Sequence, residues 1–180
     1  MTPVGELLRD SVVVWDVEAA RRLFRDGFYG KPLGIPKPRD ANFDSPLVLS
    51  IIEALYLMEQ RALKVVRAGV EVSFEELYEV GSSGEEGFAN KYQVYRDLRR
   101  RGFIVTPGLK FGSDFAVYKH GPGIDHAPFI IQVKDSSSKI SALEIVRSGR
   151  LATSVRKHFT IAVPQNSEKI VYALFEWWKA

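Results

Sequence analysis

The side chains best suited to chemistry gather in one segment of the sequence, FGSDFAVYKHGPGIDH at residues 111–126. Tyr118 ends a strand-like run, and the loop after it holds three glycine and proline residues before His126. Such a loop is exposed, so the histidine faces solvent or substrate, and an imidazole can both give and take a proton near neutral pH. Lys157 stands at the start of a later strand-like run, where its charge could neutralise charge building up on a phosphate.

Tyrosine, histidine and lysine together suit metal-free cleavage of an RNA phosphodiester. A base removes the proton of the ribose 2′-OH, the oxygen attacks phosphorus, an acid protonates the leaving 5′-oxygen, and a cation stabilises the pentavalent intermediate. Each of Tyr118, His126 and Lys157 could also be non-catalytic, as an ordinary half-buried or solvated residue. His120 would share a face with Tyr118 on a continuing strand and is a second candidate base. We expect either Lys157 or His158 to point into the domain, and a structural role for His158.

A metal-dependent nuclease is the competing interpretation. Asp114, followed by Gln132 and Lys134 on a later strand, fits a short pattern in which carboxylates hold a divalent ion and a lysine activates water. The pattern supplies one firm carboxylate and occurs by chance in many sheets. The histidines have no metal-ligand spacing, and no glycine-rich phosphate loop is present. We therefore expect no metal site and no cofactor.

Composition narrows the class of protein. The chain has 180 residues, of which 46% are hydrophobic and 26% charged, and it has no cysteine. These values favour a globular protein with a core and exclude a disulfide framework or a cysteine zinc site. No apolar run approaches the roughly 18 residues of a membrane-spanning helix, and the first ten residues lack a signal-peptide pattern. We expect a cytoplasmic protein without a membrane partner.

Charge divides the chain into two predicted domains, residues 1–83 and 84–180. The first carries 10 Lys and Arg against 13 Asp and Glu, a net charge of −3, and the second 15 against 9, a net charge of +6. The segment GSSGEEG at 81–87 predicts a loop or short linker between them. A basic half that holds all three histidines favours a polyanion-binding module, although a solvated basic face explains the charge equally well.

Hydrophobic patterns and capping residues predict helices and strands in both halves. In the first half we predict a strand at 12–15 and a helix from Asp16 to Gly27. A helix at 47–61, started by Ser45 and Pro46, a hairpin over 63–72 and a helix capped by Ser73 and Glu76 follow.

In the second half we predict a helix at 88–101 ended by Gly102 and strands at 103–107, 110–120 and 129–135. A helix with a capping box of Ser141 and Glu144, which ends near Arg156, and strands at 158–164 and 169–178 follow.

Three motifs in a fixed order carry a family resemblance. LRxxG, GLKFGxDFxVY and SVRK, between about Tyr92 and Val163, are similar to the catalytic domain of archaeal tRNA-splicing endonucleases, also called tRNA-intron lyases. LFRDGFYGKP and EALYLMEQ resemble the family's N-terminal domain more loosely. The resemblance implies an α+β fold, with a small mixed α/β N-terminal domain before a mixed-sheet, nuclease-like catalytic domain. It also implies an RNA endonuclease that removes introns from precursor tRNA at bulge-helix-bulge motifs, without a metal.

The resemblance also implies roles for individual residues. Tyr118 corresponds to the general base on the 2′-OH, His126 to the general acid at the 5′-oxygen and Lys157 to the transition-state cation. The products would be a 2′,3′-cyclic phosphate and a 5′-hydroxyl. Arg150 corresponds to an arginine that stacks on a bulged base, which exposes its π-face once it is extruded.

A substrate with two bulges implies an oligomer, because two scissile phosphates require two active sites. In the family the subunits pair through their C-terminal strands and insert an acidic loop into a neighbour. Here that loop is PQNSEK, and Glu168 is its only acid, which favours a partner that supplies the acidic loop. The resemblance thus allows a homo-oligomer or a heterotetramer with a structural subunit. A purely structural role for this chain is disfavoured, because all three catalytic residue types are retained.

A proline-rich basic loop, GKPLGIPKPRD, interrupts the otherwise acidic first half. We predict that Lys31, Lys37 and Arg39 contact RNA phosphates, because a stiff basic loop loses little entropy on binding. An idle solvated loop is the alternative.

Overall fold

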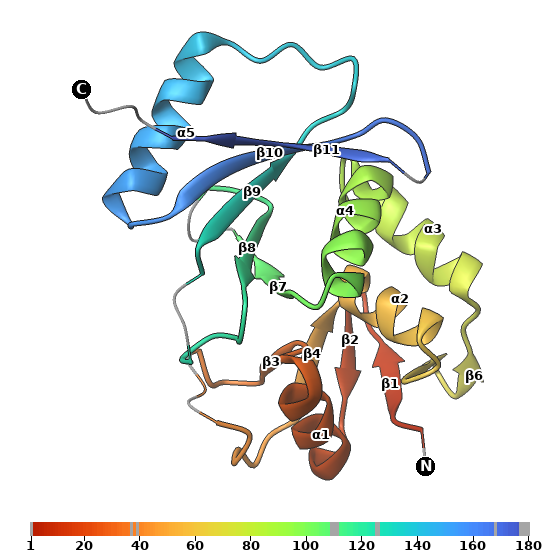
Figure 1. Ribbon diagram of the computed structural model, residues 1–180. Coiled ribbons are helices and arrows are strands. Elements are labelled where there is room, and N and C mark those ends of the chain that lie inside the picture. Colours follow the sequence, from red (N-terminus) through yellow and green to blue (C-terminus); the bar gives the residue numbers. More distant parts are fainter. Residues whose placement is uncertain are drawn as a thin grey trace. The chain divides into compact units, whose positions relative to one another are not determined.

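The chain divides into two compact units, Met1–Phe88 and Ala89–Ala180, each with its own sheet (Figure 1). The computed structural model describes residues 2–36, 38, 40–108, 112–124, 127–167 and 169–176. Both units combine helices with a mixed sheet, which confirms the predicted α+β class. The predicted boundary at Gly84 coincides with the last residue of helix α3, a few residues before the division between the units.

The N-terminal unit is built on a six-stranded sheet with the order β3-β4-β2-β1-β5-β6. Strands β1 and β5 run parallel, and the other neighbouring strands run antiparallel. The elements are β1 (Val4–Leu7), β2 (Ser11–Val14), α1 (Val17–Gly27), β3 (Lys31–Pro32), β4 (Leu47–Ser50), α2 (Ile51–Glu59), β5 (Lys64–Arg67), β6 (Val70–Glu71) and α3 (Phe74–Gly84). Apolar side chains of the central strands and of α2 are fully buried, among them Val12, Val14, Leu47, Leu49 and Leu55.

Several sequence predictions for this unit are confirmed. Asp16 caps α1, because its carboxylate accepts a hydrogen bond of 2.6 Å from the Ala19 N–H. Ser73 and Glu76 form a reciprocal capping box at the start of α3. Strands β5 and β6 form the predicted hairpin. The short strands β1 and β3 were not predicted.

The prediction of one helix over residues 47–61 is wrong. Leu47–Ser50 forms strand β4, which is bonded between β3 and β2, and α2 begins only at Ile51. Ser50, and not Ser45, is the N-cap: its hydroxyl accepts from the Glu53 N–H at 3.3 Å, and the Glu53 carboxylate accepts from the Ser50 N–H at 2.9 Å. A four-residue apolar run fits a strand or a helical turn equally well, and here the neighbouring strands decide.

The predicted loop at 81–87 is wrong in its first half, because α3 continues to Gly84. Gly81 is buried, and a Cβ at this position would collide with the ring of Phe88. The glycine is therefore needed for close packing, which outweighs its low helix propensity.

The C-terminal unit contains a five-stranded sheet with the order β11-β10-β9-β8-β7. Strands β9 and β10 run parallel, and the other neighbours run antiparallel. Its elements are α4 (Phe88–Arg100), β7 (Ile104–Pro107), β8 (Phe115–Tyr118), β9 (Phe129–Val133), α5 (Ala142–Ser154), β10 (His158–Pro164) and β11 (Ile170–Phe175). The type and order of these elements match the predictions. No helix within the described ranges is long and apolar enough to cross a membrane.

Each face of this sheet packs against one helix. On one face, Ile130, Phe159 and Ile161 form a buried cluster with Ala152 of α5. Residues alternate between the faces of a strand, so the row of Phe115 and Ile131 belongs to the other face, where the Phe115 ring lies 5.9 Å from Tyr95 of α4. Helix α5 also makes the crossover from β9 to the parallel strand β10, and its end therefore fixes where β10 begins.

Candidate active site

Two of the three predicted catalytic residues meet at one end of the five-stranded sheet. Tyr118 is the last residue of β8, and Lys157 directly precedes β10. Phe129 of β9 pairs with Val117 on one side and with His158 on the other, and the His158 N–H donates to the Pro128 carbonyl at 2.8 Å. Tyr118 and Lys157 therefore flank Pro128 one row further out, on the same face and about two strand spacings, ~10 Å, apart.

The backbone around Lys157 is fixed by the end of α5. The Lys157 N–H donates to the Ala152 carbonyl at 2.8 Å, and the Arg156 N–H donates to Thr153 at 3.0 Å. Arg156 between them has a φ of 55°, in the left-handed region. The lysine thus enters β10 directly from a tightly bonded helix end.

The Lys157 side chain also holds the segment between β8 and β9. Its Nζ donates a hydrogen bond of 2.8 Å to the carbonyl of Ala127, which is buried. His126, the residue before Ala127, lies outside the described residues, as do Lys37, Arg39 and Glu168. The lysine is half-buried, so it is the member of the Lys157–His158 pair that points toward the protein.

The two other histidines are both exposed. His120 is exposed and lies beyond the end of β8, so the continuing strand on which it would share a face with Tyr118 does not form. The His158 side chain is 47% exposed, and its Nδ1 lies 3.0 Å from a carboxylate oxygen of Glu176 at the end of β11. Its ring also lies 5.8 Å from that of Phe129, on the sheet face opposite to Lys157. His158 therefore has the structural partners expected for it, but at the surface.

The residues of the competing metal pattern bind separate partners. The Asp114 carboxylate accepts from the Val133 N–H at 2.7 Å and pairs with Lys91 of α4 at 3.0 Å. Lys134 pairs at 2.6 Å with Glu144 of α5, which also accepts a 3.3 Å hydrogen bond from Gln132. The hydrogen bond from Lys134 holds the pKa of Glu144 below its ordinary value. Within the described ranges, Asp, Glu and His residues form no group of three that could hold a metal ion.

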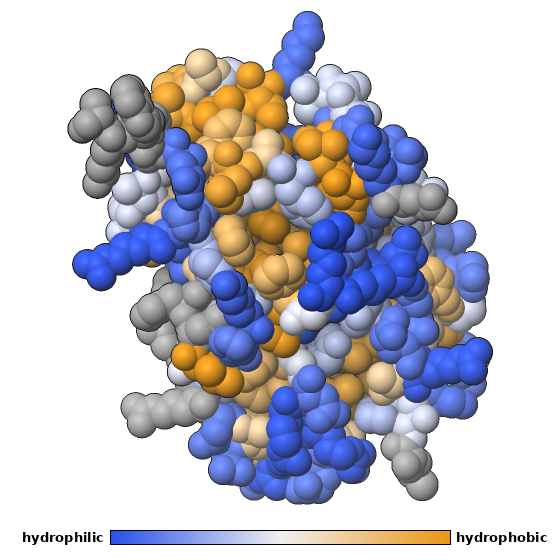
Figure 2. Space-filling model, in the orientation of Figure 1, coloured by the Kyte–Doolittle hydropathy of each residue, from blue (hydrophilic) through white to orange (hydrophobic). Residues whose placement is uncertain are grey.

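The predicted RNA-binding residues that the structure describes are exposed. Arg150 projects from α5, whose outer face also exposes Leu143, Val146 and Leu151, and Figure 2 shows hydrophobic surface over this helix. Lys31 begins β3 at the edge of the N-terminal sheet. The two residues lie in different units.

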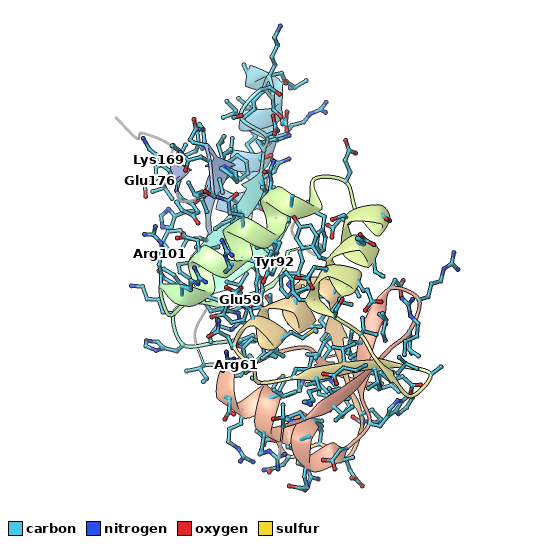
Figure 3. All side chains as sticks on the ribbon, turned by 90° about the vertical axis from the view of Figure 1, so that its right-hand side faces the viewer. Glu59, Arg61, Tyr92, Arg101, Lys169 and Glu176 are labelled. Carbon is cyan, nitrogen blue, oxygen red and sulfur yellow. The ribbon has the colours of Figure 1, made fainter. Side chains whose placement is uncertain are left out.

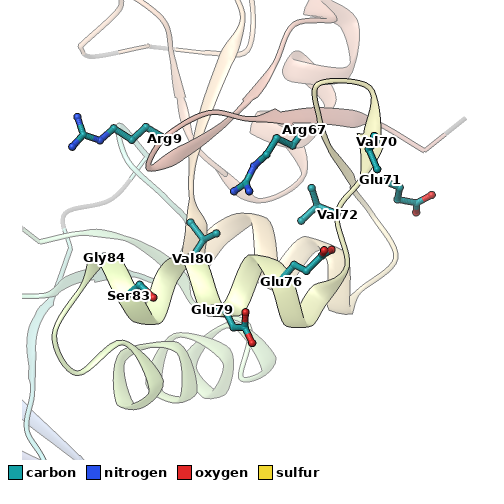
Figure 4. Close-up of a pocket in the computed structure, with 10 residues that line it drawn as sticks. All are labelled: Arg9, Arg67, Val70, Glu71, Val72, Glu76, Glu79, Val80, Ser83 and Gly84. Carbon is teal, nitrogen blue, oxygen red and sulfur yellow. The ribbon is translucent and has the colours of Figure 1, made fainter.

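A pocket of about 640 Å³ lies between the β5–β6 hairpin and α3 in the N-terminal unit (Figure 4). Arg67 points from β5 toward α3, which contributes Glu76 and Glu79. None of the predicted site residues lines this pocket, and it combines both signs of charge.

Comparison with known proteins identifies both units. Residues 88–172 match the tRNA intron endonuclease, catalytic C-terminal domain, and residues 4–78 match the tRNA intron endonuclease, N-terminal domain. A tRNA-splicing endonuclease of Hyperthermus butylicus is 51% identical over 96% of this chain and 97% of its own length. Those of Pyrobaculum islandicum and Sulfurisphaera tokodaii are 45% and 42% identical over 97% and 98% of this chain, and 98% and 99% of their own. The resemblance predicted from the sequence is confirmed, and the chain belongs to the tRNA intron endonuclease family.

Proposed function

We propose that this member of the family removes introns from precursor tRNA by cutting bulge-helix-bulge motifs without a metal ion. The observation that carries the proposal is the placement of Tyr118 and Lys157 on one face at one end of the sheet. Lys157 also donates a hydrogen bond to the Ala127 carbonyl. His126 is next to Ala127 in the chain. Tyr118 and Lys157 thus lie at the sheet edge, and the sequence puts His126 directly before the residue that Lys157 binds.

Each residue has one step in the proposed reaction. Tyr118 takes the proton of the ribose 2′-OH, whose oxygen forms a bond to the adjacent phosphorus. The bond from phosphorus to the 5′-oxygen breaks, and His126 gives that oxygen a proton. Lys157 stabilises the extra negative charge on the phosphoryl oxygens. The products are a 2′,3′-cyclic phosphate and a 5′-hydroxyl.

The contact between Lys157 and Ala127 supports this role for the lysine. An ammonium group offers three N–H donors, so one bond to a carbonyl is compatible with binding a phosphate oxygen. The same bond connects the start of β10 to the segment after His126. Substrate binding and the placement of the loop thus depend on one side chain.

Substrate binding extends beyond the reacting atoms in this proposal. Arg150 stacks on a base of the bulge, for which its exposed guanidinium on α5 is suited. Lys31, Lys37 and Arg39 bind RNA phosphates from the other unit. The loop that carries them is tied at both ends, since Glu53 accepts from the Gly30 N–H at 2.9 Å and Arg21 donates to the Phe43 carbonyl at 2.8 Å. Replacing all three loop residues by alanine is expected to weaken RNA binding and lower its salt dependence.

Two cuts per substrate require more than one active site, so the working enzyme is proposed to be an oligomer. Strand β11 is an edge strand of its sheet, and its side chains Val171 and Leu174 are 43% and 49% exposed. An apolar edge strand is suited to pairing with another subunit. The partner is a second copy of the chain or a structural subunit in a heterotetramer.

The direct test is cleavage of a bulge-helix-bulge RNA by the purified protein in EDTA, with analysis of the product ends. Cyclic phosphate and 5′-hydroxyl ends are the expected result. If the chain alone is inactive, added structural subunit is expected to restore cleavage in EDTA. Cleavage that requires Mg²⁺ and leaves other ends would overturn the proposal.

A further inference from the structure

Helix α5 ends in a strained backbone conformation immediately before Lys157. The hydrogen bonds from Arg156 to Thr153 and from Lys157 to Ala152 define a Schellman ending, in which one residue must be left-handed. That residue is Arg156, with a φ of 55°. Glycine is the usual choice here, because a Cβ raises the energy of the left-handed conformation.

Two other helices end in the same way and allow a comparison within the chain. At the end of α4, Gly102 is the left-handed residue, with a φ of 87°, and bonds run from Gly102 to Arg99 and from Phe103 to Leu98. At the end of α2 the left-handed residue is Arg61, with a φ of 56° (Figure 3). Glycine thus takes the left-handed position at the end of α4, whereas Arg61 and Arg156 retain side chains there. Of these two, Arg156 is next to a proposed catalytic residue, Lys157.

The surroundings of Arg156 are positively charged. Its side chain is exposed, and so are those of Arg147 and Arg150 on α5. None of these three arginines forms an ion pair with another described residue. The one acidic side chain of α5, Glu144, lies in its first turn and is bound to Lys134. The end of α5 thus presents an exposed guanidinium, without an ion pair to any described residue, next to the proposed transition-state cation.

We propose that Arg156 is a substrate-contacting residue that binds an RNA phosphate next to the scissile one. An arginine suits this task because its planar guanidinium donates two parallel hydrogen bonds to phosphate oxygens. The proposal rests on the proposed function, since it places the RNA at the edge that Tyr118 and Lys157 form. Because Arg61 has the same strain, the proposal rests on the exposed charge of Arg156 beside Lys157 rather than on the strain itself.

The test compares two substitutions that relieve the same strain, Arg156→Gly and Arg61→Gly. Each is expected to raise the Tm by about 2–4 °C, because glycine adopts the left-handed conformation without strain. Binding is measured with a bulge-helix-bulge RNA that carries 2′-deoxyribose at both scissile positions and is not cut. Arg156→Gly is expected to weaken binding about tenfold and to reduce the slope of log K against log salt by about 0.7–0.9, the loss of one phosphate contact. Arg61→Gly is expected to leave binding and slope unchanged.

A third variant, Arg156→Lys, distinguishes a direct contact between residue 156 and a phosphate from an indirect effect on the position of Lys157. It keeps both the charge and the left-handed strain, so it is expected to restore the salt slope. A raised Tm with unchanged binding for Arg156→Gly would overturn the proposal, and so would weaker binding with an unchanged salt slope, because the effect would then come through Lys157. Cleavage by the unaltered protein tests the proposed function separately. If the protein does not cleave the RNA but Arg156→Gly weakens binding as expected, the proposed function is refuted and the phosphate contact is not.

Discussion

Both units contain helices that begin with the same sequence signal, a serine followed three residues later by glutamate, and the two units use it differently. In the N-terminal unit Ser50 with Glu53 and Ser73 with Glu76 form closed, reciprocal boxes. In the C-terminal unit the Ser141 hydroxyl accepts from the Glu144 N–H at 3.1 Å, but the Glu144 carboxylate binds Gln132 of β9 and Lys134, which directly follows β9.

The difference shows what each helix contributes. A closed box stabilises a helix end locally, whereas the bonds of Glu144 attach the start of α5 to β9. The other end of α5 sets the position of Lys157. In the C-terminal unit the glutamate of the capping box thus gives up its bond to the helix end. It forms bonds that hold α5 against the sheet to which Tyr118 belongs. Substitutions in the two units should therefore differ in whether they alter cleavage, local stability or both.

The greatest loss of activity is expected of Tyr118→Phe, because the chemistry is assigned to the sheet edge of the C-terminal unit. Loss of the phenolic hydroxyl should lower single-turnover cleavage by about 10²–10⁴-fold, the usual contribution of a general base. Tyr95→Phe is the matched control: Tyr95 is buried and its hydroxyl accepts a 2.9 Å bond from Arg99. The control should lose stability and keep its cleavage rate, and equal losses of cleavage in both variants would count against the assignment.

The two closed capping boxes of the N-terminal unit should differ in how much they contribute to stability, because one is buried and the other exposed. Glu53 is 4% exposed, and its carboxylate accepts from the Gly30 N–H, the Ser50 N–H and the Ser50 hydroxyl. Glu53→Gln leaves an amide NH₂ facing one of these donors, so the free energy of unfolding should fall by about 2 kcal/mol. Urea unfolding checks this, with Glu76→Gln in the exposed box as control. A larger loss from the control would show that burial is not the deciding factor.

The sequence predicted elements well where the signal was local and poorly where neighbouring strands or packing decided. The capping box at Ser73 and the N-cap at Asp16 involve only residues close in the sequence. The box at Ser50 has the same pattern, but the adjacent Ser45-Pro46 competed with it, and only the pairing of β4 with β2 shows that residues 47–50 are a strand. The capping box of Ser141 and Glu144 is half formed, because Lys134 and Gln132 compete for the glutamate.

Gly102→Ala should cost about 1 kcal/mol of unfolding free energy, because it puts a Cβ on a left-handed residue at the end of α4. A Cβ built there meets no atom within 4 Å, so the loss reports the backbone alone. Thermal unfolding checks this value. A neutral result would mean that left-handed strain is too weak to explain the behaviour proposed for Arg156.

A weaker, pH-dependent effect is expected at Glu144. Its pKa is lowered in the folded protein, chiefly by the hydrogen bond from Lys134, so its contribution to stability is present above the pKa of the unfolded chain, about 4.3, and is lost as the pH falls through the folded value. Both partners are partly exposed, so Glu144→Gln should cost only about 0.2–1 kcal/mol at pH 7. The difference from the unaltered protein should shrink as the pH falls below the pKa of the unfolded chain and vanish below the lowered pKa of the folded protein. A difference that does not shrink as the pH is lowered would show that the ion pair is not its cause.

The candidate site was less accessible to sequence reasoning than the fold. Tyr118 and Lys157 are far apart in the chain, and their meeting depends on the order β8-β9-β10, which spacing alone does not reveal. It was the family resemblance that predicted that Tyr118 and Lys157 belong to one site. Neither source predicted the bond from Lys157 to Ala127 or the left-handed Arg156, since both depend on how α5 ends.

The metal-free assignment is best tested on two lysines of the catalytic unit, by comparing Lys157→Met with Lys134→Met in single-turnover cleavage of a bulge-helix-bulge RNA. Lys157 belongs to the proposed metal-free site and Lys134 to the competing metal pattern. We expect Lys157→Met to lose about 10²–10³-fold, as for removal of a group that stabilises transition-state charge, and Lys134→Met to stay within about threefold of the unaltered protein. A loss in Lys134→Met equal to or larger than that in Lys157→Met would contradict the metal-free assignment.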